Sequence, residues 1–380
     1  MTRLGDYISE FSARNHLDES IPVYSVTNDR GFCSGYFNKD VASKDKTTYK
    51  IVPRGYFAYN PSRINVGSIA WQNSAERVIV SPLYVVFKVS DKLDRQYLLH
   101  YLKSDVGMTF IKAHAAGSVR DSLKFSDLKE LPIHVVPLEK QRKIARTLDK
   151  LDALISQCHQ QANSFDTLVK SQFVEMFGTY PANPMGWDTG TIRDIVADVR
   201  YGSSRPAVDG GKYPYLRMNN ITYGGELDLT DTKRIDVPEN ELDKCTVRRG
   251  DVLFNRTNSK ELVGKTCVYN RDEMMVLAGF VIRVRVTKRI LPEFLSAFLN
   301  TDFSKQMLLG MCKAAIGQAN INAQEMQNIG LYLPPVALQQ QFIQFKSQVD
   351  KSKFSCRRAG KVANFALKCI MEDVYGVMDG

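Results

Sequence analysis

Cysteine is present in this sequence, but the spacings that would give it a structural role are missing. The seven cysteines, at positions 33, 158, 245, 267, 312, 356 and 369, form no C-x-x-C pair. Such pairs mark zinc sites, and regular sets of cysteines mark the disulfide frameworks of secreted domains. We therefore expect reduced, mostly buried thiols and no metal site.

Long apolar runs are also absent. No stretch approaches the roughly 20 apolar residues that a membrane-spanning helix needs. The first residues, Met1-Thr2-Arg3-Leu4-Gly5-Asp6, do not begin an apolar segment of signal-peptide length. We expect a soluble, cytoplasmic protein with no membrane partner.

The motifs that bind nucleotides and dinucleotide cofactors are missing as well. The sequence contains neither G-x-x-x-x-G-K-[ST] nor G-x-G-x-x-G. Tyr59-Asn60-Pro61-Ser62 only partly matches the N-P-P-[YF] motif of DNA amino-methyltransferases, and no glycine-rich turn precedes it. All five histidines lie in the first 159 residues. We expect no catalytic residue, no metal ligand and no cofactor in this chain.

Acidic residues are fewer than basic ones. The chain has 51 lysines and arginines against 41 aspartates and glutamates, and its sequence pI is near 9.1. A surface of mixed charge in water explains such a surplus, and so does an electrostatic footprint for nucleic acid.

What the sequence does contain is an internal repeat. The segment Pro137-Leu138-Glu139-Lys140-Gln141 is echoed by Pro335-Val336-Ala337-Leu338-Gln339, 198 residues later. Residues 97–104 match 294–301 at a displacement of 197, and further matches upstream have displacements of 195, 192 and 188. Changes in loop length between duplicated domains produce such a drift. Two equivalent units predict two equivalent binding events.

The repeat divides the chain into four segments. These are a globular unit at 1–136, a helix at 137–178, a second globular unit at 179–334 and a second helical segment at 335–380. Each globular unit alternates short β-rich runs with turn residues and then carries helical segments, so the predicted class is α+β. The expected strands are 21–26, 56–59, 68–71 and 83–89 in the first unit, and 213–218, 251–255, 265–269 and 280–286 in the second. The expected short helices are 95–103 and 126–130, repeated at 292–300 and 323–328.

The two long helical segments show the clearest periodicity. Apolar or small residues recur at alternating steps of three and four, which predicts a coiled-coil seam and a partner helix. About 40 residues at about 1.5 Å each give a rod of roughly 60 Å. We expect the helices to pair antiparallel about a pseudo-twofold axis, with one globular unit at each end. Pairing with helices of another protein is the alternative. The residues expected to pack between the helices are Ile144, Leu148, Leu151, Ile155, Phe342, Phe345, Val349, Ala359 and Ala363.

The expected loops are basic, rich in amides and suited to DNA. Arginine can bind the major-groove edge of guanine in two places and asparagine that of adenine, while serine, threonine and lysine suit phosphates. An ordinary solvated side chain is the alternative at each position, so the prediction rests on the whole set. The candidate DNA-binding residues are Arg30, Lys44, Lys46, Arg63, Asn65, Ser118 and Arg120 in the first unit, and Arg200, Ser203, Ser204, Arg205, Arg217, Asn219, Asn220, Arg256, Asn258, Lys260, Gln318 and Asn320 in the second.

Residues Leu131 to Ile155, with the pattern L-P-x-x-x-x-P-L-E-K-Q-R-K-I-A-R-T-L-D-K-L-D-A-L-I, carry a family resemblance. A repeated globular unit that ends in this segment resembles the specificity subunit of type I restriction-modification systems. The resemblance extends over the whole chain. The second copy, Leu333-Pro334-Pro335 followed by Gln339-Gln340-Gln341, matches more loosely, because Ala337 and Gln340 replace the Glu and Arg of the pattern.

The resemblance implies a non-catalytic subunit in which each recognition domain reads one half of a split double-stranded DNA target. The paired helices are then expected to set the unread gap and to dock two methyltransferase subunits. It also implies restriction subunits as partners, with S-adenosylmethionine, ATP and magnesium bound to the partner subunits. Exposed basic residues of the first helix, such as Arg142, Lys143, Arg146 and Lys150, are candidates for the methyltransferase interface.

Three other functions remain open at this stage. An adaptor of the same architecture would serve another modification or defence enzyme. A coiled-coil scaffold that binds only proteins would show no salt-dependent DNA affinity. An independent nuclease or methyltransferase would show activity in the isolated chain.

Overall fold

The computed structural model describes residues 2–17, 19–35, 45–115, 122–312 and 319–376. The chain forms two compact units. The first contains residues 1–159 and 358–380, and the second contains residues 160–357. Each unit therefore holds a globular domain, the start of one long helix and the end of the other. The expected α+β class and the internal repeat are both confirmed.

The first unit is built on a four-stranded antiparallel sheet with the strand order β2-β9-β6-β7. Buried Phe57, Tyr59 and Phe87 of this sheet pack against Tyr97 and Tyr101 of a helix, which places the core between them. The elements of the domain are β1 (Thr2–Arg3), η1 (Leu4–Asp6), β2 (Ile8–Glu10), β3 (Ser25–Thr27), β4 (Gly31–Cys33), β5 (Lys50–Pro53), β6 (Phe57–Tyr59), η2 (Ile64–Val66), β7 (Ile69–Trp71), β8 (Arg77–Val80), β9 (Val85–Val89), α1 (Arg95–Lys103), α2 (Asp105–Ala115), α3 (Phe125–Lys129) and β10 (Pro132–Ile133).

The second unit repeats this frame. Its main sheet has the order β12-β20-β16-β18, and a second four-stranded sheet, β14-β13-β19-β15, includes the counterparts of the β5/β8 pair of the first unit. The elements are β11 (Asp188–Thr191), η3 (Ile192–Ile195), β12 (Val196–Tyr201), β13 (Tyr213–Leu216), η4 (Met218–Asn220), β14 (Lys233–Ile235), α5 (Glu239–Cys245), β15 (Thr246–Val247), β16 (Val252–Asn255), β17 (Thr257–Asn258), β18 (Thr266–Val268), β19 (Met275–Leu277), β20 (Val281–Val286), α6 (Pro292–Leu299), α7 (Asp302–Met311), β21 (Ala319–Asn320), α8 (Ala323–Gln327) and β22 (Gly330–Leu333).

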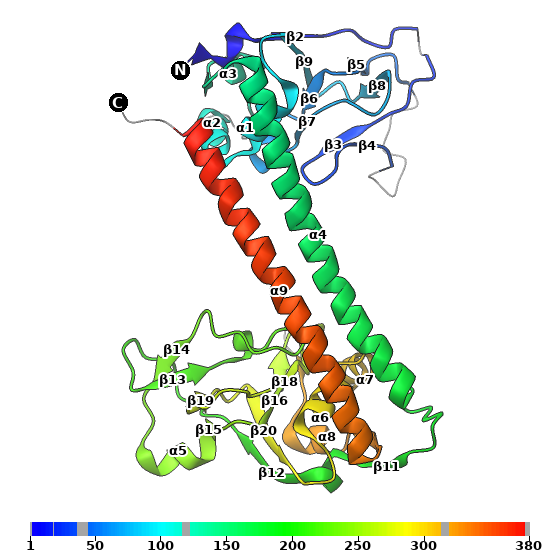
Figure 1. The fold of residues 1–380 in the computed structure, drawn as a ribbon, viewed down its shortest axis with the longest axis vertical. Helices are drawn as coiled ribbons and strands as arrows, with labels where there is room; N and C mark the ends of the chain where they lie inside the picture. The colour runs from blue at the N-terminus through cyan, green and yellow to red at the C-terminus, as the bar shows by residue number, and fades with distance from the viewer. Residues whose placement is uncertain (1, 18, 36–44, 116–121, 313–318, 377–380) are drawn as a thin grey trace. The chain divides into compact units, whose positions relative to one another are not determined.

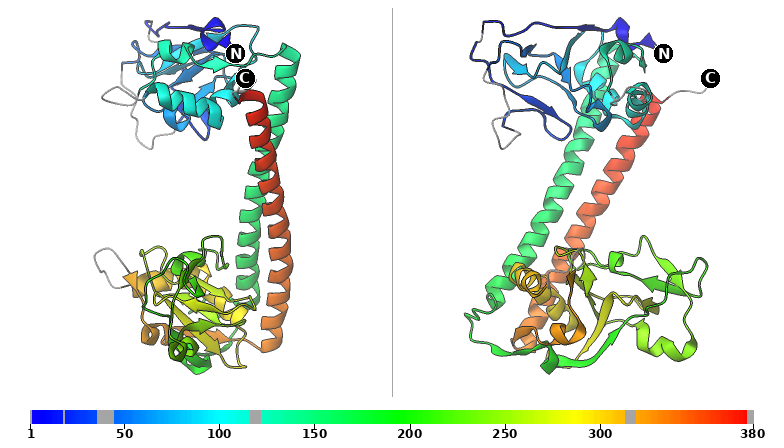
Figure 2. Two further views of the ribbon diagram at one scale, coloured as in Figure 1. Left: turned by 90° about the vertical axis from the view of Figure 1, so that its left-hand side faces the viewer. Right: turned by 180° about the vertical axis from the view of Figure 1, so that it is seen from behind.

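The long helices are α4 (Leu138–Phe177) and α9 (Val336–Tyr375), and each is unbroken over 40 residues (Figure 1). In the first unit the start of α4 packs on the end of α9, with Leu148 and Leu367 in one core cluster. Figure 2 shows these turns side by side in both of its views. In the second unit the end of α4 packs on the start of α9, and the rings of Phe173 and Phe342 are 5.2 Å apart. The helix segments are therefore antiparallel within each unit.

Most of the predicted seam residues lie on the buried faces of these helices, but Ala359 does not. Leu148, Phe342, Val349 and Ala363 are buried. Ile144, Leu151, Ile155 and Phe345 are half-buried.

The expectation that Ala359 packs between the helices is wrong, because Ala359 is exposed and its neighbour Gly360 is buried. A Cβ atom at Gly360 would lie 3.2 Å from the Cβ of Cys158, so the close approach of the helices occurs there.

A buried glutamine fixes the start of each long helix to its own domain. In the first unit Gln141 accepts a hydrogen bond from the backbone N–H of Asp94 (2.7 Å) and donates to the carbonyl oxygens of Lys92 (3.0 Å) and Val136 (2.7 Å). Asp94 caps α1 through its carboxylate, which accepts from the N–H groups of Gln96 and Tyr97. One side chain therefore connects α4, the cap of α1 and the strand connection that precedes α4.

The second unit repeats this contact 198 residues later. Gln339 accepts from the N–H of Leu291 (2.8 Å) and donates to the carbonyl oxygens of Arg289 (3.3 Å) and Pro334 (2.8 Å). Both glutamines are 0% exposed. A backbone group that loses such a partner in the interior bears its full desolvation cost.

In the second unit, a buried lysine joins the helices to the domain. Lys353 of α9 has a 5% exposed side chain and is ion-paired with Asp166 of α4 and, at 2.9 Å, with Glu226 of the loop before β14. Arg357 also contacts Glu226, at 2.5 Å. Burial alone would raise the pKa of Glu226, but the hydrogen bonds and charges of Arg357 and Lys353 lower it below the ordinary value. Lys353 thus occupies a buried position of α9 that the apolar pattern did not predict, and its charge is paired there.

We predict that replacing either glutamine, Gln141→Ala or Gln339→Ala, lowers the free energy of unfolding by about 2–4 kcal/mol, since buried backbone groups lose their partner. Denaturant unfolding measures the change. Gln340→Ala, at the exposed position next to Gln339 on the same helix, is the matched control and should change stability by less than about 0.5 kcal/mol. An equal loss of stability in Gln339→Ala and Gln340→Ala would contradict the structural role of the buried glutamine.

We predict that Lys353→Met destabilises the chain by about 1–3 kcal/mol at neutral pH, less than the roughly 3–5 kcal/mol for a fully buried pair, because both carboxylates are partly exposed. Glu226 has a lowered folded pKa. Its contribution is therefore complete above the unfolded pKa and is lost as pH falls through the folded pKa. The difference in the free energy of unfolding between wild type and variant should therefore become smaller as the pH falls. Unfolding at pH 7 and at a series of pH values below the ordinary glutamate pKa of 4.5, with exposed Lys351→Met as control, checks this, and a pH-independent difference would count against it.

Candidate nucleic-acid interface

In the second unit, several predicted residues meet at one end of the main sheet. Strand β12 ends at Tyr201 and β16 ends at Asn255, while β20 between them begins at Val281. Because β20 is antiparallel to both neighbours, these three strand ends lie together. The loops that follow β12 and β16 and the loop that precedes β20 therefore form one surface, which we call the reading edge.

Arg256 lies at the centre of this reading edge. Its guanidinium stacks 4.8 Å from the ring centroid of Tyr201, and its backbone N–H donates to the carbonyl oxygen of Phe280 (3.0 Å). The short pairing of β17 with β21 then brings Asn320 beside Thr257, whose hydroxyl donates to the Asn320 amide oxygen (3.1 Å). A stacked arginine with fixed orientation is well suited to planar recognition.

Asn220 is not part of this surface. It is 2% exposed, its amide oxygen accepts from the N–H of Arg217 (2.8 Å), and its amide nitrogen donates to the carbonyl oxygens of Asp228 (2.8 Å) and Asp231 (3.1 Å). The expectation that Asn220 contacts DNA is therefore wrong: it holds a turn. Ser203 is also buried, and its hydroxyl accepts from the N–H of Arg205 (3.2 Å).

Three predicted arginines of the second unit are engaged with carboxylates. Arg205 makes two bonds to Glu241 (3.2 and 2.8 Å), Arg217 contacts Asp231 (2.8 Å), and Arg200 contacts Asp198 (2.9 Å). The hydrogen bond and charge of Arg205 lower the pKa of the Glu241 carboxyl. Among the other predicted residues of this unit, Ser204, Asn219, Lys260 and Asn320 are exposed and Asn258 is half-buried.

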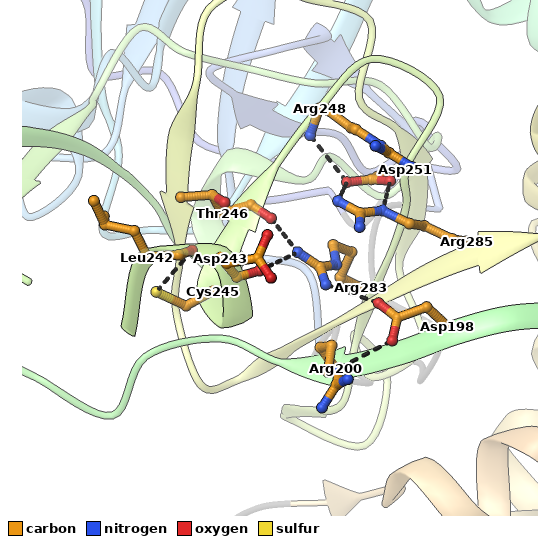
Figure 3. A network of polar contacts seen from close by, with 10 residues as sticks. All are labelled: Asp198, Arg200, Leu242, Asp243, Cys245, Thr246, Arg248, Asp251, Arg283 and Arg285. Atoms are coloured by element: carbon orange, nitrogen blue, oxygen red, sulfur yellow. Dashed lines mark hydrogen bonds and ion pairs between the residues drawn. The ribbon is translucent and has the colours of Figure 1, made fainter. Parts of the chain in front are cut away.

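The network around Arg283 holds the edge strand β12 and was missed by the sequence analysis (Figure 3). Arg283 on β20 is 2% exposed and donates to Asp198 on β12 (2.8 Å) and to the carbonyl oxygen of Thr246 on β15. Burial opposes ionisation of Asp198, but Arg283 and Arg200 lower its pKa below the ordinary value. Arg285 pairs in the same way with buried Asp251 (2.8 Å). The ion pairs join neighbouring strands of the main sheet, and the bond from Arg283 to Thr246 connects that sheet to the second one.

In the first unit, the loop after β6 and the β3/β4 hairpin border a cavity of about 270 Å³. Strand β6 is the repeat equivalent of β16, so this cavity lies at the equivalent edge of the repeated sheet. Arg63 lines it, and Arg30 sits in the hairpin turn beside Asp29. Lys46 and Asn65 are half-buried. The predicted residues Lys44, Ser118 and Arg120, and Gln318 of the second unit, lie outside the described residues.

Each reading edge also carries an exposed apolar side chain that recurs at the same place in the repeat. Leu83 precedes β9 and is 75% exposed, and Phe280, 197 residues later, precedes β20 and is 54% exposed. A single exposed apolar residue is ordinary on a protein surface, but its recurrence at the same place in both units makes it a candidate for contact with a thymine methyl group or a base step.

Among the described residues, no group of His, Cys, Asp and Glu side chains could hold a metal ion. The same residues include no helix with the length and apolarity needed to cross a membrane.

Curated proteins with similar sequences carry a common description. The EcoKI specificity subunit of Escherichia coli K12 is 24% identical over 272 residues, which cover 67% of this chain and 58% of that protein. A putative type I restriction enzyme specificity subunit of Methanocaldococcus jannaschii, MjaX, is 26% identical over 196 residues, covering 50% and 46%. The chain therefore spans about half the length of these relatives.

Solved structures show the same fold. The specificity subunit from M. genitalium superimposes with a TM-score of 0.59 at 13% identity and covers 99% of this chain and 96% of that one. A chain from a structure of a type I restriction-modification system gives 0.58 at 17% identity, covering 98% and 96%.

A family model described as the type I restriction modification DNA specificity domain matches residues 13–164 and again 184–360. The two matches coincide with the two copies of the repeat. This chain belongs to the family of type I restriction modification DNA specificity domains.

Proposed function

We propose that this chain is the DNA-specificity subunit of a type I restriction-modification complex, in which each unit reads one half of a bipartite, asymmetric target. The observation that carries the proposal is the repeated reading edge. In both units the same strand ends present arginine, amide and an exposed apolar side chain. The surrounding residues differ between the units, so two different half-sites are expected.

The long helices are proposed to set the unread gap between the half-sites and to dock two methyltransferase subunits. The two buried glutamines support the first role, because they give each helix a fixed start on its domain. The exposed basic side chains of Arg142, Lys143, Arg146 and Lys150 are the proposed contacts for the second role.

In this proposal the chain itself is non-catalytic. S-adenosylmethionine, ATP and magnesium would be bound by the methyltransferase and restriction subunits.

We predict that the full chain, with the methyltransferase subunit of its system, selects one bipartite motif with a fixed gap from a randomised duplex library. Arg256→Ala should relax the preference at one position of one half-site by about 10- to 100-fold, as expected for loss of a bidentate base contact. Arg249→Ala is the matched control, since Arg249 precedes β16, at the opposite end of that strand, and pairs with Asp272 (2.7 Å). A wild-type complex that selects no motif would refute DNA reading and favour a protein scaffold.

We predict that removing one heptad from each long helix, residues 154–160 and 358–364, shortens the gap by about 3 base pairs. Seven residues at about 1.5 Å each correspond to about 10 Å of helix, and one base pair occupies about 3.4 Å. These deletions leave Gln141, Gln339 and Lys353 in place. Selection from the same library gives the gap length, and an unchanged gap would show that the helices do not set it.

A further inference from the structure

The cavity on the reading edge of the first unit is lined mainly by polar side chains. The β3/β4 hairpin contributes Asn28 and Asp29, the loop after β6 contributes Asn60 and Arg63, and Tyr84 borders it from the start of β9. Of these residues, only Arg63 was predicted from the sequence to bind DNA. A polar cavity at this edge provides several hydrogen-bonding groups within the reach of one base pair.

Arg63 has a fixed backbone and an available side chain. Its N–H donates to the carbonyl oxygen of Asn60 (2.9 Å), and its own carbonyl accepts from the N–H of Ser68 (3.2 Å). The chain then passes through η2 to Gly67, whose φ of 86° suits glycine. Within the described parts of the chain, no carboxylate pairs with the Arg63 guanidinium, in contrast to Arg200, Arg205 and Arg217.

Asp29 supplies a carboxylate that is held in its acceptor form. The hydroxyl of Thr27 lowers its pKa, and so do nearby backbone N–H groups and Arg30, which lies 3.8 Å away. A carboxylate has about four acceptor positions, so several remain for a ligand. These effects outweigh the desolvation of this exposed carboxylate, which acts in the opposite direction.

The two asparagines are less suited to reading adenine, which needs both the oxygen and the nitrogen of one amide. The Asn60 oxygen already accepts from the N–H of Ser62 (3.1 Å). The Asn28 amide is packed over Gly67, where a Cβ atom would lie 2.4 Å from its oxygen. Among the charged and amide side chains of the cavity, Arg63 and Asp29 are therefore the best suited to decide base identity.

We infer that Arg63 and Asp29 together read one G·C base pair in the half-site of the first unit. The guanidinium donates two hydrogen bonds to O6 and N7 of guanine, and the carboxylate accepts one from N4 of the paired cytosine. In a base pair these edges are adjacent in the major groove, which suits two groups that line one cavity. The inference rests on the proposed function and adds the base class to it.

The test is selection from the randomised duplex library by the full chain with its methyltransferase subunit, using wild type, Arg63→Ala, Arg63→Lys and Asp29→Ala. Arg63→Lys keeps the charge but loses the bidentate geometry, so it separates base reading from phosphate binding. Arg77→Ala is the matched control, because Arg77 is an exposed arginine of the same unit that pairs with Glu19 (2.6 Å). Thermal unfolding of each variant verifies that it is folded.

We expect the wild-type motif to contain a G·C pair whose preference falls about 10- to 100-fold in Arg63→Ala, Arg63→Lys and Asp29→Ala, at the same position and in one half-site only. If Arg63→Ala weakens binding to all sequences equally and Arg63→Lys restores it, Arg63 contacts phosphate and the inference is wrong. Relaxation at two different positions would also overturn it. A wild-type complex with no motif would instead refute the proposed function.

Discussion

The contact on which the architecture depends is the buried glutamine at the start of each long helix. One amide accepts from a backbone N–H of its domain and donates to two backbone carbonyls, so a single side chain fixes the helix direction against the domain. The repeat retains this residue while its neighbours change: Glu139, Lys140 and Arg142 are replaced by alanine, leucine and glutamine. Solvated side chains tolerate such changes, whereas an interior amide that serves three backbone groups has no substitute of equal geometry.

Away from the two buried glutamines, the units share the arrangement of strands and helices but differ in the side chains that occupy it. Arg283 and Lys353 form buried ion pairs in the second unit, and the equivalent positions in the first, Val86 and Ile155, are apolar. An apolar side chain and a paired charge can both occupy these strand and helix positions, since a buried charge is tolerated when it is paired. The β5/β8 pair of the first unit corresponds to β15 and β19 of the second, where β13 and β14 extend it to four strands. A duplicated scaffold can therefore carry two unrelated recognition surfaces.

Periodicity predicted the frame of this protein well and its polar interior poorly. The helix at 95–103 has the expected bounds, and seven of the eight expected strands agree within about two residues, whereas the strand expected at 21–26 is β3 at 25–27. The seam was misread at Ala359 because the buried residue is its neighbour Gly360, and glycine carries no apolar signal. Lys353 was missed because a buried lysine does not look like a core residue until its partners, Asp166 and Glu226, are known. Asn220 was misread for a related reason: an asparagine that holds a turn and one that faces a ligand are identical in sequence. Strands such as β2, β5, β8, β14, β15 and β19 were missed because runs of four residues or fewer leave no periodic signal, and β12 was missed although it has six residues, none of them buried.

The ion pairs on the reading edge decide which arginines have interaction energy left for a ligand. Arg200, Arg205 and Arg217 each face a carboxylate, so DNA binding would have to replace a bond that already exists. Arg63 and Arg256 have no carboxylate partner among the described residues, and Arg256 is oriented by the Tyr201 ring instead. A bound base would therefore gain full hydrogen bonds from these two side chains at little reorganisation cost. Selectivity in each unit then depends on very few residues, so one loop can change without disturbing the sheet and helices beneath it.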